Sequence, residues 1–170
     1  IKEQLGVEDV VIPYPVMVKL ASTLREHSFH VCVKGEHKDD RFVCMEICDP
    51  ADARLVGCAI DIGTTTVSMV IVDLDSGKLL AKGSSGNGQI RYGADVINRI
   101  IESTRPGGRK KLQDAILKET LNPIIANLCK TAGIDCPAIL RLCIGANTTM
   151  NHLLLGVDAD SVRMEPYIPS

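Results

Sequence analysis

A short polar segment, Asp61-Ile62-Gly63-Thr64-Thr65-Thr66, follows a run of apolar residues and combines residue types that bind phosphate and a divalent cation. Glycine can adopt φ > 0, which lets the neighbouring amide N–H groups point outward. Two or three such amides, together with threonine hydroxyls, form a concave surface of hydrogen-bond donors for phosphate oxygens. We therefore predict that Gly63, Thr64, Thr65 and Thr66 bind phosphate.

Asp61 is expected at the end of a strand, beside this donor surface. A carboxylate in that position suits Mg²⁺, which keeps most of its waters and needs only one or two protein oxygens. The same carboxylate could orient an attacking water in phosphoryl transfer. We predict that Asp61 is catalytic and holds Mg²⁺ through water. The alternative is a plain hairpin in which the Asp and Thr side chains only satisfy backbone groups.

The elements around this segment predict a mixed α/β unit over residues 56–170. Strands are expected in the run Val56–Gly63, which we predict to be covered on both faces, and at Val67–Asp73, Lys78–Ser84 and Ile139–Ile144, with a turn at Asp75-Ser76-Gly77. Helices are expected after Gly93-Ala94-Asp95, over Lys110–Thr131 with a kink or division at Pro123, and after Asn147, which caps a helix ending at Gly156. The order gives three hairpin-linked strands followed by a crossover onto the sheet.

Residues 1–55 predict a separate, small α+β domain. Residues 1–15 contain two prolines and are expected to be a linker or a cut edge, and a short helix follows from Val16 to His27. Two strands are expected at residues 29–33 and 41–47, joined by a turn over the polar stretch Lys34–Asp40.

The composition is typical of a globular protein and limits the kinds of partner that we expect. The 170 residues are 45% hydrophobic and 24% charged, so a packed core is expected. A net charge of −2 favours neither nucleic acid nor an anionic membrane as partner. No apolar segment approaches the ~20 residues of a membrane span. The seven cysteines are odd in number and several lie in apolar runs, which favours a cytoplasmic chain with reduced thiols.

Asp61–Thr66 resembles the first phosphate motif of the superfamily that contains actin, sugar kinases, hexokinase and heat-shock chaperones. The element order is similar to the first half of that actin-like, ribonuclease H-like ATPase fold. Gly145–Met150 follows the fourth strand, where that family has its first connecting segment. The resemblance implies that Asn147 and Thr148 lie at the edge of a nucleotide cleft or at its hinge, whereas a helix cap alone would also explain Asn147.

Three longer segments are more specific: Cys58–Val67, Asn87–Ile100 and Gly145–Gly156. Together they resemble ATP-dependent reductive activators of corrinoid proteins. That family couples ATP hydrolysis to an uphill one-electron transfer from an iron–sulfur cluster, which reduces Co(II) corrinoid to Co(I). The resemblance implies ATP and Mg²⁺ as cofactors and a corrinoid protein as partner, and it allows a homodimer.

The chain departs from that family in two respects. No four-cysteine cluster pattern is present, and Cys44-x-x-x-Cys48 is the closest pair. The family's second ATPase half is also absent. We therefore expect a fragment whose iron–sulfur cluster belongs to the missing part of the protein, and which is inactive by itself.

Other functions stay open on the same fold. The chain could belong to another actin-fold activator or kinase, such as a 2-hydroxyacyl-CoA dehydratase activator or a sugar kinase. A non-catalytic dimerisation or docking module is the third alternative. The segment Gln89–Gly93 is expected either to be a loop in which Arg91 pairs with a carboxylate, or to lie near the cleft or a partner surface.

Overall fold

The computed structural model describes residues 2–169. The chain divides into two compact units, Ile1–Leu55 and Val56–Ser170. No helix among residues 2–169 has the length and apolar character needed to cross a membrane.

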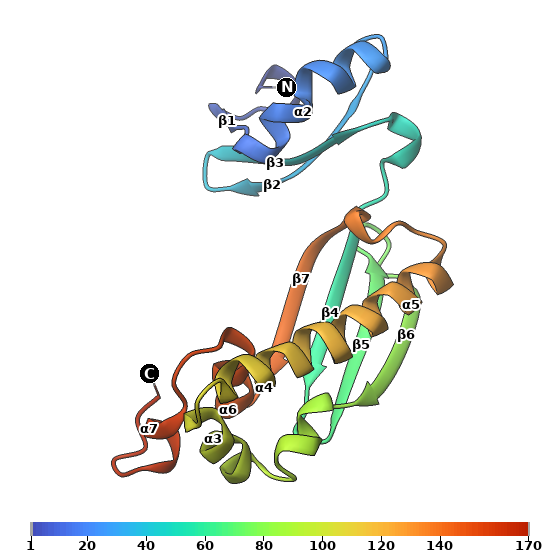
Figure 1. The fold of residues 1–170 in the computed structure, drawn as a ribbon. Coiled ribbons are helices and arrows are strands. Elements are labelled where there is room, and N and C mark those ends of the chain that lie inside the picture. Colours follow the sequence, from blue (N-terminus) through green and yellow to red (C-terminus); the bar gives the residue numbers. More distant parts are fainter. Residues whose placement is uncertain (1, 170) are drawn as a thin grey trace. The chain divides into compact units, whose positions relative to one another are not determined.

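The first unit is a three-stranded sheet with helices (Figure 1). Its elements are α1 (Lys2–Leu5), β1 (Asp9–Val11), α2 (Tyr14–Glu26), β2 (Cys32–Lys38), β3 (Arg41–Cys48) and the 3₁₀ turn η1 (Pro50–Asp52). The sheet order is β1-β3-β2, with β1 parallel and β2 antiparallel to β3. The predicted helix is confirmed, and Val16, Leu20 and Leu24 lie on its less exposed side.

Two predictions for this unit are wrong in detail. The first hairpin strand begins at Cys32 and runs through Lys38, so the turn is limited to Asp39 and Asp40. Its polar residues concealed the strand, because a polar side chain can be buried in a sheet when it has a partner: Lys34 is buried and its Nζ lies 2.8 Å from Glu46 Oε2. The segment expected to be only a linker contains β1, whose three residues are too few to give a periodic pattern.

The second unit is a four-stranded mixed sheet with helices against it. Its strands are β4 (Val56–Ile62), β5 (Thr66–Asp73), β6 (Leu79–Gly86) and β7 (Ile139–Ala146), in the order β6-β5-β4-β7. β4, β5 and β6 pair antiparallel, whereas β7 lies parallel to β4 after the crossover. The remaining elements are η2 (Gly88–Tyr92), α3 (Val96–Thr104), α4 (Gly108–Ile116), η3 (Leu117–Leu121), α5 (Asn122–Ala132), η4 (Cys136–Ala138), α6 (Thr148–Leu155) and α7 (Asp160–Arg163).

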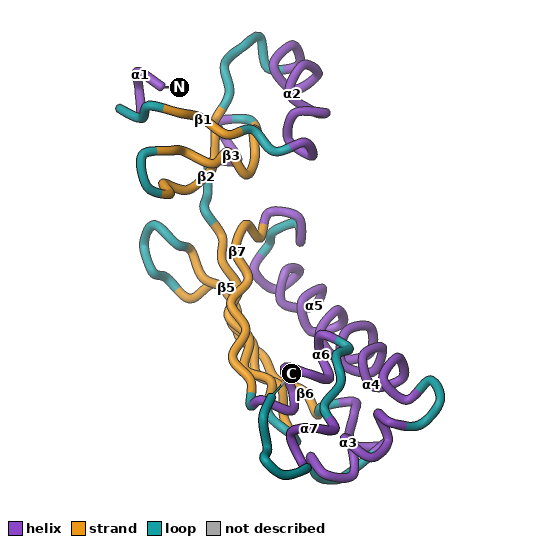
Figure 2. Tube along the Cα trace, turned by 90° about the vertical axis from the view of Figure 1, so that its left-hand side faces the viewer, coloured by secondary structure: helices purple, strands orange, loops and turns teal. Residues whose placement is uncertain are grey.

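The core of this unit lies between one face of the sheet and the helices, which Figure 2 shows on one side of the strands. Cys58, Ile60 and Ile62 of β4 point into this core. Ala59 and Asp61 alternate with them and are exposed, so the prediction that β4 is covered on both faces is wrong. Alanine counts as apolar in a sequence pattern and therefore hid a two-residue alternation. The open face carries Asp61.

The long helix predicted to kink or divide at Pro123 is divided just before that residue. α4 and α5 are separated by η3, a π turn, and the N–H of Asn122 donates to the carbonyl of Leu117. Because Pro123 has no N–H, the helix cannot bond regularly at this point. Leu112, Ile116 and Leu128 are buried, which keeps both halves against the core.

Candidate functional site

The turn from Gly63 to Thr66 joins β4 to β5. It closes on a hydrogen bond of 3.0 Å from the N–H of Gly63 to the carbonyl of Thr66. Gly63 does not adopt the positive φ that the sequence analysis expected, and its amide points into the turn. The glycine is needed for space instead: a Cβ at this position would lie 2.6 Å from the Thr66 carbonyl oxygen.

Three consecutive carbonyls of the turn are held from the protein side. Asn87 Nδ2 donates to the Gly63 carbonyl at 2.9 Å, and Arg99 Nη2 donates to the Thr64 carbonyl at 2.6 Å. The backbone N–H of Asn87 donates to the Thr65 carbonyl at 2.8 Å. In a trans peptide the N–H points opposite to the C=O, so the amide that follows each held carbonyl is turned away from the donors. The outward donors are thus the amides of Thr64 and Thr65, because the backbone of Thr66 faces Gly63 across the turn.

The threonine side chains extend this donor surface. Thr65 and Thr66 are exposed, and Thr64 is half-buried. Within residues 2–169, the structure pairs neither the Thr64 nor the Thr65 amide with a protein acceptor. Hydroxyls and unpaired amides on one short turn form the kind of concave donor surface that binds oxyanions.

Asp61 lies on the open face of β4, two residues before Gly63. In the sheet it is opposite Ser68 of β5 and beside Gly145 of β7. Paired residues point to the same face, and Gly145, the β7 partner of Asp61, has no side chain to crowd the carboxylate. An exposed carboxylate beside outward amides and hydroxyls fits Mg²⁺ held through water, with the remaining positions taken by water and phosphate oxygens.

The second predicted segment meets the first at the N-terminus of α6. Asn147 caps this helix, since its Oδ1 accepts from the N–H of Met150 at 2.9 Å, and Gly156 ends the helix with φ 71°. Asn147 Nδ2 also lies 3.4 Å from Thr64 Oγ1. Thr148 is exposed at the first position of the helix. The structure therefore brings Thr64 and Asn147 together, and within residues 2–169 no hydrogen bond joins Thr148 to the turn.

Asn87 and Arg99 were not among the predicted site residues. Both are fully buried. Burial lowers the pKa of Arg99 from its ordinary value, and the charge of Asp95 opposes this in part. One signal was available in the sequence: Arg99 shares the helix face of Val96 and Ile100, where an isolated charged residue is unusual.

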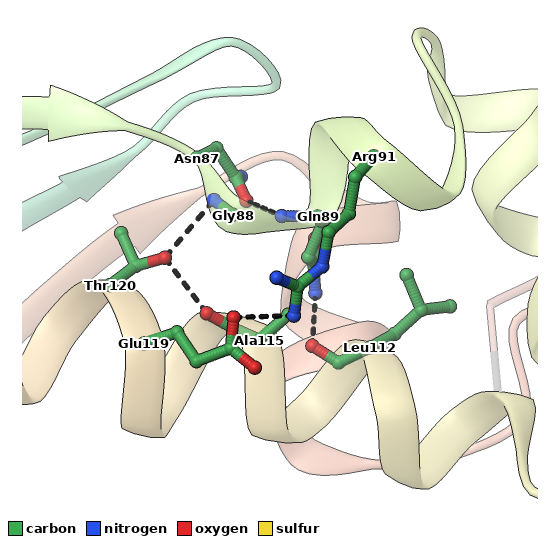
Figure 3. Close-up of polar contacts among 8 residues, drawn as sticks. All are labelled: Asn87, Gly88, Gln89, Arg91, Leu112, Ala115, Glu119 and Thr120. Carbon is green, nitrogen blue, oxygen red and sulfur yellow. Dashed lines mark hydrogen bonds and ion pairs between the residues drawn. The ribbon is translucent and has the colours of Figure 1, made fainter.

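The segment 87–92 is fastened to the π turn (Figure 3). The N–H of Gly88 donates to Thr120 Oγ1 at 3.0 Å, and that hydroxyl donates to the Ala115 carbonyl at 2.8 Å. Gln89 Nε2 donates to the carbonyl of Leu112 at 2.9 Å. The predicted pairing of Arg91 with a carboxylate is confirmed, because its guanidinium bonds the Glu119 carboxylate. Asn87, which holds the Gly63 carbonyl, is thereby tied to the long helix.

The side chains that commonly bind metals do not cluster in the part of the chain that the structure describes. Among residues 2–169, no group of three or more His, Cys, Asp or Glu side chains is placed to hold a metal ion. Cys44 is buried and Cys48 is half-buried, both as free thiols.

Comparison with known proteins identifies close relatives. The family model described as the RACo middle region matches residues 56–170. A "Corrinoid activation enzyme RamQ" from Eubacterium limosum is 36% identical over 140 residues, which are 82% of this chain and 23% of that protein. The solved structure titled "Reductive activator for corrinoid,iron-sulfur protein" has a TM-score of 0.83 and 37% identity, over 99% of this chain and 27% of that one.

The chain thus spans about a quarter of the length of these two relatives. The matches confirm the resemblance drawn from the sequence. They also confirm the predicted fold class, a mixed sheet with flanking helices preceded by a small α+β region.

Proposed function

Because the chain belongs to the family described as the RACo middle region, we propose that it is part of an ATP-dependent activator that reduces a Co(II) corrinoid protein to the Co(I) state. The two relatives named for corrinoid activation and for reductive activation support this substrate class. In the proposal this chain supplies the first phosphate-binding half of the ATPase. The iron–sulfur cluster belongs to a part of the protein outside it.

One observation carries the ATPase role: the held carbonyls of the turn at Gly63 leave the amides of Thr64 and Thr65 as outward donors. These amides and the threonine hydroxyls bind the phosphate oxygens of ATP. Asp61 would hold Mg²⁺ through water, and its carboxylate orients the attacking water. When bound, Mg²⁺ offsets the charge that develops on the transferring phosphoryl group. Asn147 and Thr148 form the edge of the same cleft at the start of α6.

The proposal is tested by replacing Asp61 with Ala in the full-length protein. We expect ATP hydrolysis and ATP-dependent appearance of Co(I), followed by absorbance, to fall on the order of 100-fold or more, the scale of a lost acid–base group. The fold should stay intact, because Asp61 is exposed and packs in no core.

Asp75→Ala is the matched control, since Asp75 is an exposed carboxylate in the turn between β5 and β6. It should leave both rates unchanged. An Asp61→Ala protein that hydrolyses ATP at the parent's rate would show that this carboxylate is not part of the ATPase site.

A further inference from the structure

Two buried residues outside the predicted donor set, Asn87 and Arg99, contact the backbone of the phosphate turn. We infer that they are positioning residues of the phosphate site: they occupy the carbonyls of the turn so that its amides face the ligand. The inference rests on the proposed function, because it assigns a task within the same site.

Asn87 holds the turn with its side-chain Nδ2 and with its backbone N–H. Its exposed fraction is 1%. Nδ2 donates to the Gly63 carbonyl at 2.9 Å, and Oδ1 accepts from the N–H of Gln89 at 2.9 Å. Its own backbone N–H donates to the Thr65 carbonyl at 2.8 Å. Asn87 therefore holds the carbonyls of both Gly63 and Thr65. The bond from the Gln89 N–H fixes the orientation of the Asn87 side chain.

Arg99 holds the carbonyl between those two. Its exposed fraction is 0%. Nη2 donates to the Thr64 carbonyl at 2.6 Å, Nε donates to the Gly93 carbonyl at 2.8 Å, and Nη1 lies 3.4 Å from Met150 Sδ. No carboxylate bonds this guanidinium anywhere in residues 2–169.

A buried cation whose hydrogen-bond partners are all neutral is costly. The charge of Asp95 offsets this cost only in part, and an anion bound at the turn would offset more of it. Here the guanidinium lies directly behind a turn whose outer side presents donors. A donor on the Thr64 carbonyl polarises the peptide group that joins Thr64 to Thr65. The Thr65 N–H, on the other side of that peptide group, then becomes a stronger hydrogen-bond donor. The positive charge also attracts an anion more strongly from a buried position than it would from water. Both effects favour bound phosphate, and neither acts on the uncharged part of a nucleotide.

The inference is tested by comparing the affinity for Mg·ATP, which carries phosphates, with the affinity for adenosine, which does not. Affinities of full-length protein for Mg·ATP and for adenosine are measured by calorimetry and by competition, for the parent, Asn87→Asp and Arg99→Met. Asn87→Asp keeps the shape but replaces the Nδ2 donor with an acceptor, and Arg99→Met keeps much of the volume without the charge. We expect the preference for Mg·ATP over adenosine to fall about tenfold or more in each variant, the scale of a hydrogen bond to a charged group. Adenosine affinity should not change.

Matched controls carry the same chemical changes at exposed positions. Asn127→Asp on α5 and Arg109→Met on α4 should both keep the parent's preference. Asp61→Ala is measured in parallel. If Arg99→Met does not fold, Arg99→Lys replaces it, and its loss of the planar donor fork should still lower the preference.

The outcomes separate the two proposals. A parent protein without any preference for Mg·ATP overturns the proposed function and this inference with it. A parent whose preference falls in Asp61→Ala but survives in Asn87→Asp and in the Arg99 variant overturns the positioning role alone. Equal losses for Mg·ATP and adenosine would also overturn it, because they would indicate general damage to the fold.

Discussion

Position 63 needs a residue without a side chain, because the backbone of Thr66 passes too close to leave room for a Cβ. A Cβ would lie 2.6 Å from the Thr66 carbonyl oxygen, which is the acceptor that closes the hairpin. A β carbon at that distance must push the acceptor away, so the cost of a substitution lies in the turn's closing bond. The neighbouring amides then lose the orientation that the held carbonyls give them.

Gly63→Ala is therefore expected to lower the free energy of unfolding by about 1–3 kcal/mol, the usual scale of overpacking. It should also weaken binding of Mg·ATP. Gly86→Ala is the matched control on the neighbouring strand, where a Cβ would meet no atom within 4 Å. Urea unfolding of the parent and both variants measures the difference. Equal midpoints for Gly63→Ala and the parent would show that the turn accommodates a side chain.

For single residues, the sequence predicted features that depend on near neighbours better than features that depend on distant residues. The turn at Asp61–Thr66 and the cap at Asn147 depend on neighbours within a few residues, and both were found where predicted. The supports Asn87 and Arg99 lie 24 and 35 residues from the carbonyls they hold, so their role follows only from the folded arrangement. The positive φ expected of Gly63 was wrong because a close backbone contact, invisible in sequence, also requires glycine.

Among the elements, the π turn between α4 and α5 has a clear structural task. Its Thr120 hydroxyl accepts from the N–H of Gly88 and donates to the Ala115 carbonyl. A Cβ on Gly88 would come 2.9 Å from that hydroxyl, so the two backbones approach closely. The wide turn thus connects the long helix to the segment that begins with Asn87.

We expect Thr120→Val to lower the free energy of unfolding by about 1–3 kcal/mol, because it removes both bonds and leaves the part-buried Gly88 N–H without its partner. Thr131→Val on α5 is the matched control, since that hydroxyl is exposed and bonds the Asn127 carbonyl of its own helix. It should change the stability by less than about 0.5 kcal/mol. Hydrogen exchange of the Gly88 amide should accelerate in Thr120→Val alone. Unchanged exchange there would contradict the role assigned to Thr120.

Element types were predicted well in the second unit because its strands and helices have strong apolar periodicity. The first unit was predicted less well, since β1 has three residues and the polar part of β2 resembles a turn. Lys34 illustrates the reason: a lysine reads as exposed, and only the opposite strand shows that Glu46 pairs with it in a buried position.

For the whole molecule, the donor surface described here lies on a chain that spans about a quarter of its two named relatives. The proposed phosphate donors come from one turn and one helix start, on one side of a ligand. The resemblance to actin-like ATPases implies a second half that contributes contacts from the other side.

We predict that the 170-residue chain by itself neither hydrolyses ATP nor reduces a Co(II) corrinoid protein at a useful rate. Losing a single well-placed donor typically raises a barrier by ~2.7–4 kcal/mol, and here a whole side of the site would be absent. Circular dichroism first establishes that the isolated chain is folded, and ATP turnover is then measured with and without the corrinoid protein. Turnover comparable to that of the full-length protein would mean that these residues form a complete active site.

The π turn also affects how the length of the helical stretch from α4 to α5 can vary. Along α4, η3 and α5 the buried leucine and isoleucine residues are separated by four, five, three and four positions: Leu112, Ile116, Leu121, Ile124 and Leu128. A step of five is one residue longer than an α-helix needs, so the turn behaves as a single-residue insertion that leaves the apolar stripe in phase. Deleting the exposed Lys118 would restore a step of four and keep the core contacts. It would also remove the wide turn on which Gly88 rests, so a shortened homologue could retain the sheet packing yet lose the support behind Asn87.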